Sequence, residues 1–118
     1  MGLDTLTIEQ ARNVEAGVET DAMVAEACGW KYHGTAAVYT IWLTPGGTVV
    51  SRPSTDPNVA LEAGNDFGAG NGASVFDGDT ANDWEAYGGD IRVRGPSLCV
   101  AICRAILVRH VLGREAKA

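Results

Sequence analysis

The chain has 118 residues, of which 46% are hydrophobic and 20% charged, and its net charge at neutral pH is −6. This length predicts one domain with a core of its own, and the composition excludes a wholly disordered chain. Proteins that bind nucleic acid usually carry a net basic domain, so we expect no nucleic-acid partner.

The first elements predicted along the chain are two helices. Thr7 and Gln10 have the spacing of a capping box, which predicts a short helix that begins there and ends near Asn13. A second helix is expected over residues 18–28, because their apolar side chains fall within one wide arc. Gly29 is expected to cap this helix at its C-terminus.

The middle of the chain predicts a pair of strands followed by a helix. Residues 37–43 are rich in β-branched and aromatic side chains, which favour a strand. The Pro and Gly residues within 44–47 predict a type II turn, and residues 48–50 a returning strand. Asp56 is expected to be the N-cap of a helix that begins at Pro57.

Residues 64–83 are rich in glycine and aspartate, and we predict a loop region there. Gly64 is expected to end or weaken the preceding helix, and residues 75–76 are expected to form a short strand. Beyond the loop region, residues 84–94 predict a hairpin or bent strand, because apolar and charged side chains alternate there.

The last predicted helix covers residues 98–112, with Ser97 as its N-cap. It is apolar on nearly every side, so other elements must cover more than one of its faces. Gly113 is expected to end it, and residues 114–118 to form a flexible tail. We predict a single domain, residues 1–118, of the α+β class: a small, mainly antiparallel sheet with helices packed on both faces, as in an α/β/α sandwich.

This last helix is too short to span a membrane, and it carries Arg104 and Arg109. The first residues lack the basic and apolar pattern of a secretory signal, so we expect no membrane partner and a cytoplasmic location. An odd number of cysteines fits a reducing compartment better than a disulfide scaffold. The cysteines, which we expect to be buried, are Cys28, Cys99 and Cys103.

Three stretches together resemble a known family. Residues 16–26 lead into Gly29 and Trp30, residues 53–56 open the middle helix, and residues 101–105 lie in the last helix. In this order and spacing they are similar to the phage ABA-sandwich domain family, which consists of small proteins encoded by phages and prophages. The resemblance implies a small sheet with helices on both faces and a viral origin, and therefore the cytoplasm of an infected host cell. It implies no catalytic residue.

The segment before the middle helix is the strongest candidate site. A helix N-terminus presents free amide groups, and the hydroxyls of Ser54 and Thr55 lie beside it, so the segment is expected to bind an anion. Arg52 would pair with a phosphate or carboxylate group of the ligand. Trp42 is expected to act as a stacking wall, and Arg104 as a cation that faces the pocket.

Each of these residues also has a structural interpretation. Asp56 can cap the helix while Ser54 and Thr55 shape the turn that enters it. Trp42 can belong to the core, and Arg104 can extend to the surface or pair with a buried acid. The sequence leaves both interpretations open.

We predict no catalytic residue, no metal site and no cofactor. His33 and His110 lie outside any recognisable catalytic motif. Residues 77–83 contain three aspartates, but Ala81 stands where the calcium loop of helix–loop–helix proteins needs Asp or Asn.

We therefore expect a phage-encoded binding protein without catalysis, whose small anionic, nucleotide-like ligand it sequesters from a host defence system. The alternative is an acidic inhibitor or accessory subunit, because residues 62–90 hold seven acids and neither Lys nor Arg. A small hydrolase that uses converging acids ranks last. Residues 91–118, in contrast, hold six bases and one acid, and the last helix is a candidate interface for a homo-oligomer.

Overall fold

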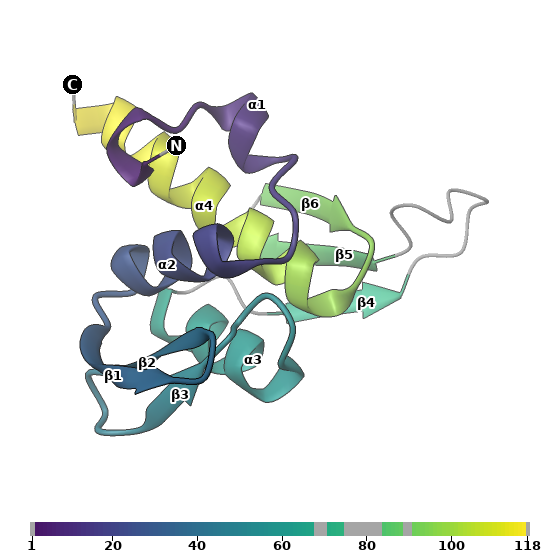
Figure 1. Cartoon of the computed structure of the whole chain (residues 1–118). Helices are drawn as coiled ribbons and strands as arrows, with labels where there is room; N and C mark the ends of the chain where they lie inside the picture. The colour runs from purple at the N-terminus through teal and green to yellow at the C-terminus, as the bar shows by residue number, and fades with distance from the viewer. Residues whose placement is uncertain (1, 68–70, 75–83, 89–90, 118) are drawn as a thin grey trace.

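The computed structural model describes residues 2–67, 71–74, 84–88 and 91–117. In chain order, the elements are η1 (Leu3–Thr5), α1 (Ile8–Ala11), α2 (Val18–Ala27), β1 (Lys31–Ala36), β2 (Tyr39–Leu43), β3 (Val49–Ser51), α3 (Pro57–Phe67), β4 (Asn71–Ser74), β5 (Trp84–Gly88), β6 (Ile91–Gly95) and α4 (Leu98–Lys117) (Figure 1).

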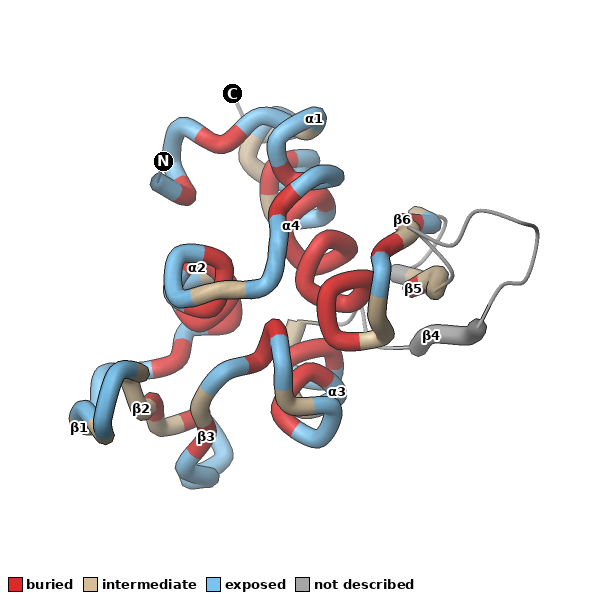
Figure 2. Tube along the Cα trace, turned by 45° about the vertical axis from the view of Figure 1, so that its right-hand side comes forward, coloured by how far each residue is buried: buried red, intermediate tan, exposed pale blue. Residues whose placement is uncertain are grey.

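The long helix α4 forms the middle of the molecule. Ser97 caps its N-terminus, because the Ser97 Oγ accepts a hydrogen bond from the Val100 amide at 3.2 Å. Every residue from 99 to 108 is buried, and the other α-helices and the strands β4 to β6 pack around the helix (Figures 1 and 2). The prediction that this helix is covered on more than one face is confirmed.

The C-terminal end of α4 differs from the prediction. The helix does not end at Gly113 but continues to Lys117. The Arg114 guanidinium donates hydrogen bonds to the backbone carbonyls of Leu3 and Asp4, both at 2.8 Å, and of Leu6. These bonds anchor the last turns of α4 to the N-terminal segment, so residues 114–117 are helical where a flexible tail was expected.

The strands form two antiparallel sheets of three strands each, in the orders β1–β2–β3 and β4–β5–β6. This confirms the α+β class with antiparallel strands. The strands divide into two sheets, where the sequence suggested one; α3 follows the first sheet in the chain, precedes the second and packs against α4. The first sheet buries Trp42 and Val50 on the side of α2, and the second buries Ala86 and Val93 against α4.

Strand β1 was not predicted. Its residues are mostly exposed and include Gly34, so no alternation of buried and exposed side chains marks a strand there. It forms because its backbone pairs with β2 along its length, with a shift of register between Tyr32 and Gly34. His33 therefore lies in a strand.

The helix starts were predicted well. Thr7 and Gln10 form the capping box, although α1 is shorter than expected. Helix α2 begins at Val18, and Gly29 follows it with a φ of 73°, a left-handed conformation that glycine adopts without steric cost.

Helix α3 begins at Pro57 with Asp56 as its N-cap, as predicted. It then passes through Gly64 and ends at Phe67, so of the two alternatives predicted for Gly64, that it ends or weakens the helix, the first is wrong. Ala63 and Gly64 are both buried, and α3 packs against α4.

The hairpin predicted over residues 84–94 is confirmed, because β5 and β6 pair antiparallel. Residues 71–74 form β4, which pairs with β5 inside the region that was predicted as a loop. The short strand predicted at residues 75–76 lies outside the described residues.

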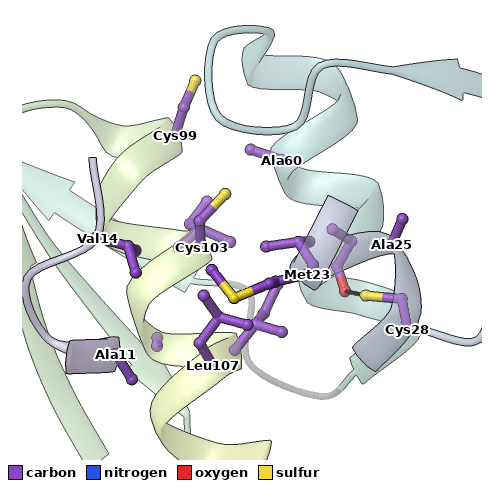
Figure 3. Packing of buried hydrophobic residues seen from close by; sticks show 14 of the residues in the cluster. Ala11, Val14, Met23, Ala25, Cys28, Ala60, Cys99, Cys103 and Leu107 are labelled. Carbon is purple, nitrogen blue, oxygen red and sulfur yellow. Dashed lines mark hydrogen bonds between the residues drawn. The ribbon is translucent and has the colours of Figure 1, made fainter. Parts of the chain in front are cut away.

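The core between α2 and α4 is made of medium-sized side chains. Met23 of α2 points between Cys103 and Leu107 of α4 (Figure 3). The three cysteines are free and buried, as expected. Burial raises the pKa of Cys28 to about 12 and the pKa of Cys103 well above its usual value, so these thiols pack as small apolar groups.

Candidate functional site

Ser54, a predicted ligand contact, is bound within the protein. Its Oγ accepts a hydrogen bond from the Gly17 amide at 3.0 Å, and its own amide donates to Asp21 Oδ1 at 2.8 Å. The residue is 2% exposed. Ser54 therefore joins the segment before α3 to the beginning of α2.

Asp21 is a buried acid whose carboxylate holds this junction. Burial raises its pKa, whereas hydrogen bonds from the Ser54 side chain and amide, and the positive charge of Arg52, lower the pKa. Burial has the larger effect, so the pKa lies above the ordinary value of 3.8. At pH values between 3.8 and the raised pKa, the Asp21 carboxyl is therefore protonated in a larger fraction of folded molecules than of unfolded ones.

We expect the Asp21→Asn variant to gain stability relative to the wild type as the pH rises. The wild type loses free energy of unfolding as the pH passes from 3.8 through the raised pKa of Asp21, because the folded state binds more protons over this range. Asn keeps an acceptor for the Ser54 amide but does not titrate. Urea unfolding of both proteins from pH 3.5 to 7 measures the difference, and a difference independent of pH would contradict the assignment.

Arg52 and Thr55 are the exposed residues of the predicted site. Arg52 has a φ of 54°, and its carbonyl accepts hydrogen bonds from the amides of Thr55 at 3.1 Å and Asp56 at 2.9 Å. Its guanidinium lies over the Tyr39 ring, 4.3 Å from the ring centroid. The Arg52 side chain is thus held against β2 by a cation–π contact.

Trp42 belongs to the core. It is 8% exposed, and its ring makes a tilted contact with Trp30 at 6.4 Å between centroids. The indole Nε1 of Trp30 in turn donates a hydrogen bond to Asp66 Oδ2 at 2.8 Å. Trp42 therefore packs on the buried face of the first sheet, where a ligand at the protein surface does not contact its ring.

Arg104 links three parts of the fold. Its Nε donates to the Val14 carbonyl at 2.9 Å, and one terminal nitrogen donates to the Arg94 carbonyl at 3.0 Å. Burial lowers its pKa, while the charge of Glu15 raises it, and the guanidinium stays a cation at neutral pH. Arg104 joins α4 to β6 and to the segment before α2.

A groove beside the end of α1 is lined by three arginines that are far apart in the sequence. Its volume is about 760 Å³, within the range of about 300–1,000 Å³ that is usual for small-molecule sites. We call it the arginine groove, and it is lined by Arg12, Phe67, Ile91, Arg92, Arg109, Leu112 and Gly113. Its cations come from α1's C-terminal end, from β6 and from α4, and its apolar side chains from α3, β6 and α4.

A second, polar hollow of about 370 Å³ adjoins the arginine groove and shares Arg12 and Arg92 with it. Glu85, a carboxylate in its wall, lies 3.7 Å from the Arg94 Nε and raises the pKa of Tyr87 through a hydrogen bond. The Arg92 guanidinium lies 5.6 Å from the centroid of the Tyr87 ring. The Glu85 carboxylate therefore interacts with Arg94 and Tyr87, which belong to the same sheet.

Sequence reasoning missed the arginine groove, although part of its signal was visible. Residues 91–118 were seen to be basic, and Arg92 and Arg109 belong to that segment. Arg12 lies far away in sequence and joins them only because α1 packs against α4.

In comparisons with known proteins, no family model and no curated protein matches this chain. Among the described residues, no helix is both long and apolar enough to cross a membrane, and no three metal-ligating side chains gather. Four of the seven acids of residues 62–90, among them the three aspartates of residues 77–83, lie outside the described residues, so the roles expected for this segment stay predictions.

Proposed function

We propose that this chain is a non-enzymatic binding protein that holds a small anionic ligand in the arginine groove. One observation carries the proposal: Arg12, Arg92 and Arg109, from separate elements, line one groove in a chain whose net charge is −6. Guanidinium groups bind phosphate and carboxylate through charged, often paired hydrogen bonds. The proposed anion site is therefore this groove, in place of the segment that contains Arg52, Ser54 and Thr55.

The biological setting is part of the same proposal. The resemblance to the phage ABA-sandwich family supports a protein made from a phage or prophage genome and working in the cytoplasm of the host cell. There, the ligand would be a nucleotide-like signal of a host defence system, which the protein removes by binding it without turnover.

We expect nucleotide ligands to raise the melting temperature of the wild type, and Arg92→Gln to reduce this effect. Binding at a hundredfold excess over Kd stabilises the folded state by about 2.7 kcal/mol. Loss of one charged hydrogen bond costs about 1.5–3 kcal/mol, which weakens binding roughly 10- to 100-fold. Thermal unfolding with a panel of nucleotides at saturating concentration measures both effects.

Arg52→Gln is the matched control, because it removes the same charge from the surface at the segment that the sequence favoured. We expect this variant to bind as the wild type does. If no nucleotide stabilises the wild type, the proposed function is wrong. If Arg52→Gln loses binding and Arg92→Gln keeps it, the ligand binds before α3 and the assignment to the groove is wrong.

A further inference from the structure

We infer that the ligand of the arginine groove is a flat ring joined to a phosphate group, which is the chemistry of a nucleoside monophosphate. This inference rests on the proposed function and concerns which part of the groove binds which part of the ligand. The groove has an apolar part and a cationic part. A ligand with a flat ring and a phosphate group can contact the apolar part with its ring and the cationic part with its phosphate.

The apolar part is formed by Phe67, Ile91 and Leu112. Leu112 is 39% exposed, and the other two are partly exposed, so these side chains present apolar surface to a ligand. The ring of Phe67 is held by a tilted contact with His110, at 6.3 Å between ring centroids. A nucleobase that packs on this surface would remove apolar area of the ligand and of the protein from water. Stacking on an aromatic ring is possible for every type of base.

The cationic part surrounds the place where the groove meets the polar hollow. Arg12 and Arg92 line both spaces, so a phosphate at their junction lies within reach of both guanidinium groups. The contact of Arg92 with the Tyr87 ring limits the freedom that this side chain would lose on binding. Arg109 lies three residues before Leu112 on α4, which brings a third cation to the same face of that helix.

Size and charge favour a small ligand over the alternatives. A free phosphate ion would use the arginines and leave the apolar surface of a groove of about 760 Å³ in contact with water. A long polyanion would meet the field of a chain whose net charge is −6. A single ring with one phosphate avoids both mismatches.

The test is isothermal titration of the full chain with adenosine 5′-monophosphate, ribose 5-phosphate, inorganic phosphate and adenosine. We expect adenosine 5′-monophosphate to bind at least tenfold more tightly than ribose 5-phosphate, because ribose 5-phosphate lacks the nucleobase. Adenosine is expected to bind at least tenfold more weakly than its monophosphate, because it lacks the anion. Equal affinity for the monophosphate and inorganic phosphate would overturn the inference and leave an anion site, whereas binding of none of the probes would refute the proposed function too.

The variant Leu112→Asn tests the apolar part of the groove separately from the cationic part. We expect it to weaken binding of adenosine 5′-monophosphate about threefold to tenfold and to leave the affinity for ribose 5-phosphate unchanged. Leu61→Asn is its matched control, since Leu61 is 40% exposed on a helix and does not line the groove. If both variants bind adenosine 5′-monophosphate as the wild type does, the ring does not lie on this surface and the inference is wrong.

Discussion

Replacing Arg104 with methionine is expected to lower the free energy of unfolding by about 3 kcal/mol, because the change leaves two backbone carbonyls without their donors. Those carbonyls belong to Val14 and Arg94, and Arg104 itself is 8% exposed. Apolar replacement of a buried charge can be harmless when its partners are replaced with it. Here the partners are backbone groups, which no substitution of Arg104 removes.

Thermal and urea unfolding measure this loss, which corresponds to a fall in melting temperature of roughly 10 °C for a chain of this size. Arg12→Met is the control, because it makes the same substitution at an exposed position. That variant is expected to change stability by no more than about 0.5 kcal/mol. Equal melting temperatures for the two variants would show that the hydrogen bonds of Arg104 contribute little to the fold.

Gly95→Ala is expected to destabilise the fold by about 2–3 kcal/mol through overpacking. A Cβ atom at this position would lie 2.7 Å from the amide nitrogen of Ala101 and 3.0 Å from its Cα. Both atoms belong to the backbone of the first turns of α4, so relief requires β6 and α4 to move apart. Urea unfolding measures the loss.

Gly113→Ala provides a control with the opposite sign. Gly113 lies inside α4, and a Cβ atom there would meet no heavy atom within 4 Å. Alanine is the better helix former, so this variant is expected to gain about 0.5–1 kcal/mol. A stable Gly95→Ala protein would mean that the end of β6 and the start of α4 separate easily.

Local signals in the sequence predicted the local structure. The starts of α2 and α3 and the β5–β6 hairpin follow from caps, periodicity and alternation, each of which acts within a few residues. Strand β1 was missed because its stability comes from pairing with β2. The passage of α3 through Gly64 was missed because packing against α4 outweighs the weak helix propensity of glycine.

The candidate site was harder to predict than the fold, because the same residue type serves binding and structure. An arginine within an apolar helix can face a ligand, or it can bond to backbone carbonyls as Arg104 does. Ser54 was chosen for its hydroxyl, and that hydroxyl is engaged by Gly17. The groove forms because the fold brings Arg12, Arg92 and Arg109 close together, and no pattern along the sequence predicts that they are neighbours.

The position of α4 also bears on how the protein is made in the cell. The three other α-helices each pack against α4, and α4 follows every other described element in the chain. While the ribosome is still adding the residues of α4, the sides of the preceding helices that pack against α4 in the finished fold stay uncovered. The nascent chain therefore completes its fold only after α4 leaves the exit tunnel, and until then it presents the kind of surface that chaperones bind.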